Sequence, residues 1–138
     1  MQKSSIQTDF ASLVLRVIFG LFMLFGHGWM KVMKVINGDW KFASVLGMGE
    51  EVSLLSAVFA EAICSILLII GFKTRIAATI LLVTMLIAGF VIHSEAPLFI
   101  ANAEGGGSKE LALMYGSVFL TLIFLGGRKF SIDGILKS

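Results

Sequence analysis

Four long runs of apolar residues constrain this chain more than any other feature of its sequence. They span about residues 10–30, 52–72, 76–93 and 110–126. A helix of roughly 20 apolar residues crosses the hydrocarbon core of a bilayer. One such run could form a core helix of a soluble protein, but four runs in 138 residues leave too little polar surface to cover such a core. The sequence therefore predicts one all-α domain over residues 1–138, an integral membrane four-helix bundle.

The composition excludes several other classes of protein. Hydrophobic residues make up 57% of the chain and charged residues 14%, whereas soluble domains have about 45–50% and about 25%. Lys and Arg form no cluster of four or more, so we expect no nucleic-acid partner. The single cysteine, Cys64, excludes an intramolecular disulfide, and without Cys/His ligand spacings or an HExxH motif the sequence predicts no metal site.

The connections between the runs predict how the helices are arranged. Lys73-Thr74-Arg75 joins the second and third runs so tightly that these two helices must be antiparallel neighbours. The first run is longer than the apolar core of a signal peptide, so we interpret it as a retained span. Between the first two runs, Asp39 is placed to cap a short helix, which would form an amphipathic outer segment near residues 39–46 and contain Trp40.

The distribution of charge predicts the orientation in the membrane. The side that holds both termini and the Lys73–Arg75 turn carries seven basic residues: Lys3, Arg16, Lys73, Arg75, Arg128, Lys129 and Lys137. The opposite side carries four, namely Lys31, Lys34, Lys41 and Lys109. That side also holds six of the nine acids: Asp39, Glu50, Glu51, Glu95, Glu104 and Glu110. Because basic residues stay on the cytoplasmic side, we expect the N- and C-termini to be cytoplasmic.

Polar side chains within the spans are the candidate functional residues. An ionisable group there costs about 2.5–3.5 kcal/mol, so it is first interpreted as functional, with a named partner. Arg16 and Glu61 differ by roughly 7 Å in depth, which an Arg side chain can bridge, so we expect them to pair. Such a pair could also serve only to lock two helices together. The predicted ligand pocket comprises Arg16, His27, Lys31, Glu61, His93 and Tyr115.

The same stretches resemble the DoxX family of small four-helix membrane proteins. The likeness is carried by Leu15-Arg16 through Gly20, by His27-Gly28 with Lys31, and by Glu61 leading to Gly71-Phe72-Lys73-Thr74-Arg75. Its most specific part is Gly126-Gly127-Arg128-Lys129-Phe130-Ser131-Ile132-Asp133, where the family pattern has a Pro within the turn that this chain lacks. The resemblance implies an integral protein of a bacterial cytoplasmic membrane. Some family members resemble subunits of quinone-linked oxidation, and others are associated with resistance to quinones and catechols. A distantly similar eukaryotic branch acts in cargo export.

These observations lead to two functional hypotheses. In the first, the chain is a redox-associated membrane subunit that binds a quinone-like or other small amphipathic ligand in its polar pocket. A quinone is then the candidate cofactor, and a protein partner must carry the electrons, so the chain is a subunit of an oxidoreductase and not catalytic alone. In the second, the chain is a non-catalytic assembly, cargo-binding or transport subunit with a purely structural polar cluster. Both hypotheses imply contact with the lipid bilayer and either a protein partner or a homo-oligomer.

Overall fold

The computed structural model describes residues 5–103 and 107–137, and helices dominate this part of the chain. The helical elements in chain order are α1 (Ile6–Met23), η1 (Leu24–Gly28), α2 (Trp29–Ile36), α3 (Glu50–Val58), η2 (Phe59–Ile63), α4 (Cys64–Ile70), α5 (Thr74–Ile87), η3 (Ala88–Ile92), η4 (Ile100–Asn102), α6 (Glu110–Leu125) and α7 (Ile132–Ile135). Three of them, η1, η2 and η3, are π-helices, and each continues an α-helix without a break.

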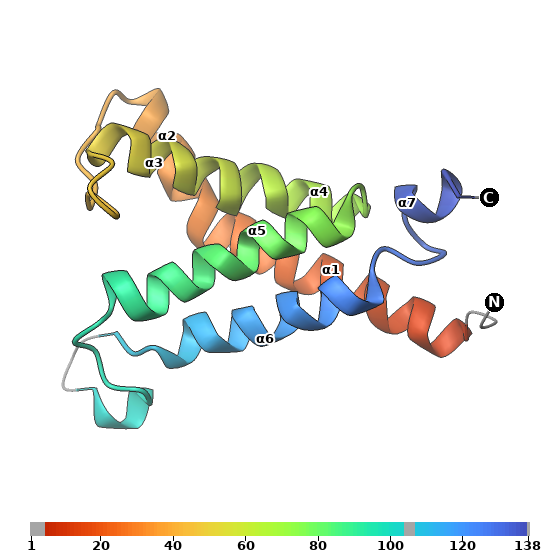
Figure 1. Cartoon of the computed structure of the whole chain (residues 1–138). Coiled ribbons are helices and arrows are strands. Elements are labelled where there is room, and N and C mark those ends of the chain that lie inside the picture. The colour runs from red at the N-terminus through yellow and green to blue at the C-terminus, as the bar shows by residue number, and fades with distance from the viewer. Residues whose placement is uncertain (1–4, 104–106, 138) are drawn as a thin grey trace.

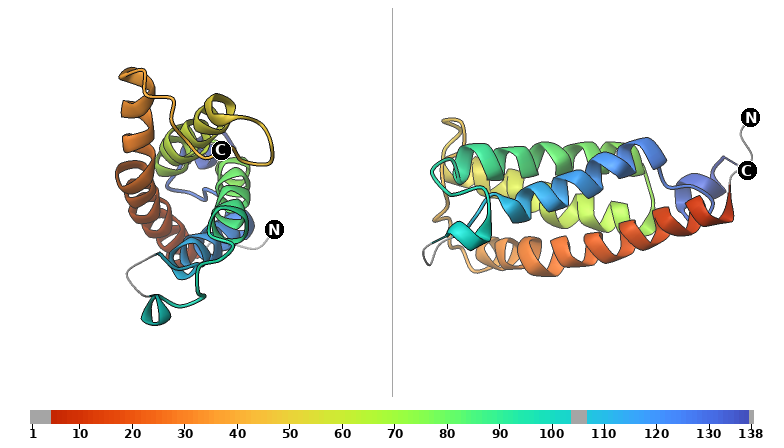
Figure 2. Two further views of the ribbon diagram at one scale, coloured as in Figure 1. Left: turned by 90° about the vertical axis from the view of Figure 1, so that its left-hand side faces the viewer. Right: turned by 90° about the horizontal axis from the view of Figure 1, so that it is seen from below.

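The elements combine into four rods: α1–η1–α2, α3–η2–α4, α5–η3, and α6 alone. The rods run side by side, and the end view shows them arranged around a ring (Figures 1 and 2). α1 packs against α4 and α6, while α5 packs against α4 and α6. The start of α1 and the short α7 lie at the same end of the bundle (Figure 1), which we call the terminal end. The opposite end, with the two long connections, is the loop end.

The prediction of an all-α membrane protein is confirmed. Three rods, Ile6–Ile36, Glu50–Ile70 and Thr74–Ile92, are long and apolar enough to cross a bilayer. They expose large apolar side chains around the bundle, as lipid contact requires and as water would penalise. α6 is shorter, with 16 residues, although it forms the fourth wall of the bundle. A fourth membrane crossing therefore stays a prediction.

The bundle core lies between α1, α4, α5 and α6. Its fully buried side chains are mostly aliphatic and aromatic, and they include Met23, Leu68, Leu81, Phe119 and Leu122. The small residues of α5, such as Ala77 and Ala78, lie within this core and leave room for larger neighbours. The core thus extends from the cavity level into the terminal half of the bundle.

The C-terminal segment closes the terminal end and explains its sequence motif. The Asp133 carboxylate accepts hydrogen bonds from the backbone N–H groups of Lys73 and Thr74, at 2.8 and 2.9 Å, and so caps the start of α5. The Asp133 N–H donates to the Gly71 carbonyl, and the Ser12 hydroxyl donates to the Gly126 carbonyl. The most specific part of the family resemblance therefore holds the turn between α4 and α5 in place.

The predicted amphipathic helix near residues 39–46 is wrong, because this segment contains no helix. The Asp39 carboxylate accepts a bond from the Lys41 N–H, two residues ahead, which forms a local turn and not a helix cap. Leu46 has a left-handed φ of 51° and interrupts any regular structure. The segment crosses the loop end with Val45 buried as its anchor.

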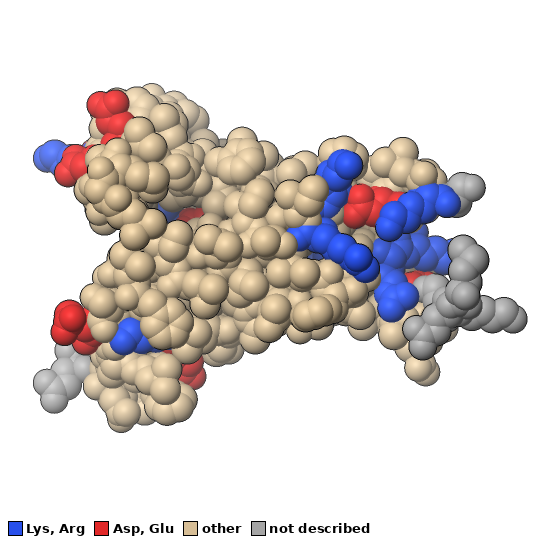
Figure 3. Space-filling view, viewed as in Figure 1, with Lys and Arg blue, Asp and Glu red and all other residues tan. Residues whose placement is uncertain are grey.

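Charged residues gather at the two ends of the bundle, as the face in Figure 3 shows. Lys and Arg gather at the terminal end, and several acids lie at the loop end. Most of the surface between them is neither basic nor acidic. Two residues of the predicted charge count, Lys3 and Glu104, lie outside the described part of the chain.

Candidate ligand-binding site

A cavity of about 500 Å³ lies in the loop half of the bundle. All four rods and both loops contribute to its wall, which is mainly apolar with a few polar groups. Its lining residues include His27 and Lys31 from the first rod, Glu61 from the second, His93 beside the third and Tyr115 from α6. The structure thus brings five of the six predicted site residues around one space.

An ion pair between Lys31 and Glu61 forms the polar floor of this cavity. The Lys31 ammonium donates to the Glu61 carboxylate and links the first rod to the second. The Glu61 side chain is 9% exposed and that of Lys31 is 20% exposed. A charged pair that is this well buried loses much of its hydration, so its attraction is only weakly screened.

His27 and Tyr115 form the aromatic side of the cavity. Their ring centroids are 5.6 Å apart, and the rings are nearly perpendicular at 88°. Phe19 and Phe119 pack on Tyr115 from below, with centroids at 5.8 and 6.0 Å. The half-buried His27 also lies close enough to Lys31 and Glu61 to interact with both charges. A polar ring, an ion pair and a phenol therefore face one cavity from three rods.

His93 lies at the rim and is exposed. It immediately follows η3, and its N–H closes the last π-type bond to the Ala88 carbonyl at 2.9 Å. This position gives the imidazole access to solvent at the loop end.

The three π-helices coincide with the site. His27 lies in η1, Glu61 lies in η2, and His93 directly follows η3. Single π-turns within α-helices are rare and occur often at functional sites, since the wider turn re-aims side chains. No pattern of apolar periodicity reports a π-turn, so sequence analysis did not find this feature.

The first two rods touch backbone to backbone at the level of these π-turns. A Cβ atom placed on Gly28 would lie 2.5 Å from the Glu61 carbonyl oxygen and 2.9 Å from the Ala62 nitrogen. Only glycine permits this approach. The contact brings the helix that carries Lys31 within reach of the Glu61 carboxylate.

Comparisons with known proteins place the chain in a family. The DoxX pattern matches residues 11–94, which is more than half of the chain. The chain belongs to the DoxX family. A protein of Haemophilus influenzae, described only as uncharacterized, is 38% identical over 111 residues, covering 73% of this chain and 80% of that protein. No solved structure matches the chain.

Arg16 lies within the residues that match the DoxX family. The structure places it outside the lining of the predicted pocket. The expected Arg16–Glu61 ion pair is wrong, because Glu61 pairs with Lys31. The fully buried Arg16 guanidinium instead donates to the backbone carbonyls of Leu68, Ile69 and Phe130 at the terminal end. These carbonyls lie at the end of α4 and in the C-terminal segment. In this DoxX protein Arg16 therefore does not line the cavity, and it links α1 to the end of α4 and to the C-terminal segment.

The DoxX bundle also contains lining residues that sequence analysis missed. The segment before α3 covers the cavity with Phe42, Val45 and Met48. Its backbone is held by the Ser53 hydroxyl, which accepts from the Val45 N–H at 2.9 Å. A polar Ser53 within an apolar run was the sequence feature that could have indicated this contact, although it was not recognised. Within residues 5–103 and 107–137, no three His, Cys, Asp or Glu side chains converge as metal ligands would.

Proposed function

We propose that this DoxX-family protein is a redox-associated membrane subunit that binds a quinone-like or other small amphipathic ligand. The observation that carries this proposal is the single cavity that His27, the Lys31–Glu61 pair, His93 and Tyr115 share. Its volume, about 500 Å³, lies in the range of about 300–1,000 Å³ that is usual for small-molecule sites. An apolar wall with a few convergent polar groups is also the usual composition of such sites.

The side chains suit a ligand that accepts hydrogen bonds and exchanges protons. The Lys31 ammonium has three donor positions and uses one of them on Glu61, so a ligand carbonyl can approach it. The imidazole of His27 can donate a hydrogen bond to a carbonyl or exchange a proton with the ligand. His93 at the rim then offers a proton route toward solvent. Electrons must pass to and from a partner protein, which makes the chain one subunit of a quinone-linked enzyme.

We also propose that α6 is a fourth span and that both termini are cytoplasmic in a bacterial cytoplasmic membrane. Sixteen helical residues reach about 24 Å, which a bilayer core of about 30 Å accommodates by local thinning. Glu110 at one end of α6 and Arg128 beyond the other can place their charged groups at the two interfaces. The gathering of basic residues at the terminal end supports the orientation.

Mass spectrometry of lipid extracts from gently purified protein tests the ligand proposal. The wild type is compared with Glu61→Gln and with Glu51→Gln, a matched control because Glu51 is exposed on the same rod and does not line the cavity. We expect stoichiometric quinone in the wild type and in Glu51→Gln, and much less in folded Glu61→Gln.

An absence of quinone and of any other enriched small molecule from all three samples would overturn the proposal. The chain would then fit the second hypothesis, a non-catalytic assembly, cargo-binding or transport subunit. The Lys31–Glu61 pair would in that case serve only to hold the first two rods together.

A further inference from the structure

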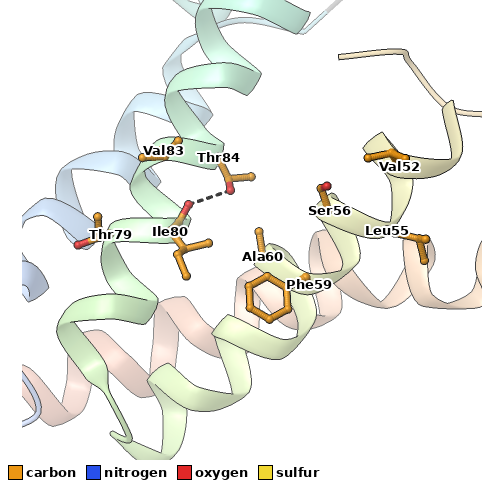
Figure 4. Close-up of a pocket in the computed structure, with 9 residues that line it drawn as sticks. All are labelled: Val52, Leu55, Ser56, Phe59, Ala60, Thr79, Ile80, Val83 and Thr84. Carbon is orange, nitrogen blue, oxygen red and sulfur yellow. Dashed lines mark hydrogen bonds between the residues drawn. The ribbon is translucent and has the colours of Figure 1, made fainter. Parts of the chain in front are cut away.

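A second hollow lies on the outside of the bundle, against the cavity. It is an open groove of about 580 Å³ between α3–η2 and α5, among exposed apolar side chains of both rods (Figure 4). Apolar and small side chains line it: Val52, Leu55, Ser56, Phe59, Ala60, Thr79, Ile80, Val83 and Thr84. The groove carries no charged residue in its wall.

Two residues, Ser56 and Thr84, line both the groove and the internal cavity. On the second rod, Ser53, Ala57 and Glu61 repeat every four residues and face the cavity, whereas Val52, Leu55 and Phe59 line the groove. Ser56 stands between these two faces. Thr84 has the corresponding place on α5, and Figure 4 shows the two side chains on opposite sides of the gap between the helices.

The two rods separate at this level, which leaves only small side chains between the hollows. α5 packs against α4 and η2, but toward α3 the two helices diverge (Figures 1 and 4). The Thr84 hydroxyl donates to the Ile80 carbonyl of its own helix at 2.8 Å. Its polar group is therefore satisfied, and a hydrocarbon chain can pass it without leaving a hydrogen bond unmade.

We propose that the ligand of the cavity carries a long apolar tail, which leaves between Ser56 and Thr84 and lies in this groove. The inference rests on the proposed function and specifies the ligand class as a membrane amphiphile with a polar head. A cavity of about 500 Å³ holds a head group but not a long tail as well. The continuous apolar groove beside it leads the tail directly into the bilayer, so the ligand enters laterally from the lipid phase.

The groove should contribute to binding of the tail mainly through complementary shape, and little through the hydrophobic effect. A tail in the bilayer is already surrounded by hydrocarbon, so moving it into an apolar groove gains packing but little transfer free energy. The head group in the cavity holds the tail at high effective concentration beside the groove. We therefore expect the tail to strengthen binding of the head, and the groove to bind an ordinary acyl chain only weakly.

Two probes test this inference: a substituted benzoquinone without a tail and the same benzoquinone with a decyl chain. Binding of each is measured with the full chain in lipid nanodiscs. Val83→Trp fills the groove, because Val83 lines it and is 49% exposed. Leu86→Trp is the matched control, since Leu86 lies on the same helix, is 43% exposed and does not line the groove. Leu55→Trp fills the groove from the opposite wall if the first variant fails to fold.

We expect Val83→Trp to weaken the decyl probe at least tenfold and to leave the tailless probe unchanged, with Leu86→Trp altering neither. Wild-type protein that binds both probes equally, with no effect of Val83→Trp or Leu55→Trp, would overturn the inference while leaving the proposed function intact. The groove would then hold only bilayer lipid. If neither probe binds the wild type, both the inference and the quinone proposal are overturned.

Discussion

The Lys31–Glu61 pair gives a prediction that separates its structural role from its role in ligand binding. Lys31→Met removes the ammonium and leaves the Glu61 carboxylate, only 9% exposed, without its partner. Breaking one side of a buried pair costs about 3–5 kcal/mol. Because the Lys31 side chain keeps 20% exposure and water can reach that side, we expect a loss of about 3 kcal/mol in the free energy of unfolding.

The double variant Lys31→Met/Glu61→Met should recover most of this loss. Replacing both members of a buried pair by apolar side chains of similar volume is often neutral or stabilising, because no charge remains to be desolvated. The two substitutions should therefore be strongly non-additive, with a coupling of about 2–3 kcal/mol. Yet the double variant should bind no quinone, since the polar floor of the cavity is gone.

Reversible unfolding in mixed micelles gives the four free energies of this cycle, and quinone content gives the second readout. Additive single effects would show that the two charges do not interact in the membrane-embedded protein, and this would refute the reasoning. A stable double variant that keeps its full quinone content would place the ligand elsewhere. Recovery of stability without ligand would show that the pair is needed for binding and not for folding.

Three further predictions concern the packing and the terminal end. Gly28→Ala should lower the thermal midpoint, at a cost of about 1–3 kcal/mol, because its Cβ meets the Glu61 backbone, whereas Gly26→Ala, with nothing within 4 Å, should not. Arg16→Met should destabilise the bundle by several kcal/mol, measured by unfolding, yet protein that still folds should keep its ligand. Burial would raise the pKa of Asp133, but hydrogen bonds from Thr74 and Lys73 outweigh it and lower the pKa. The stabilisation from Asp133 should therefore be present above about pH 4 and be lost as the pH falls through the lowered pKa, and Asp133→Asn should flatten this acid limb of unfolding.

The spans could be predicted from sequence because the length of an apolar run reports directly on bilayer thickness. The ends of the rods were less predictable, and the end of the first rod determines which residues meet in the site. The first run was expected to end near residue 30, but its helix continues to Ile36. This extension carries Lys31 on the helix itself, where its side chain meets Glu61. The segment near 39–46 failed as a helix for a local reason, the turn that the Asp39 carboxylate forms with the Lys41 N–H.

The Arg16–Glu61 pair was predicted only from the depth of the two residues in the membrane. That depth does not indicate which neighbouring helix a side chain faces. Counting residues along regular helices gave an axial gap that an Arg side chain could bridge. The count took no account of the π-turn that carries Glu61, nor of the backbone carbonyls that accept hydrogen bonds at the end of α4. The Leu68 carbonyl accepts the Gly71 N–H, and it shares the Arg16 guanidinium with the Ile69 carbonyl at the end of the helix, where carbonyls have no further turn to bond.

The buried ionisable groups therefore divide between the two ends of the bundle according to what satisfies them. Arg16 is fully buried and donates to fixed backbone carbonyls, so its environment cannot change without unfolding the end of α4. The Lys31–Glu61 pair borders open space and retains partial exposure, so its hydrogen-bonding capacity can be shared with a ligand. The free-energy cost of placing an ionisable side chain in the membrane does not by itself distinguish Arg16 from the Lys31–Glu61 pair. The adjoining cavity, together with the π-turns that surround it, is the reason why we propose ligand binding for the Lys31–Glu61 pair and a structural role for Arg16.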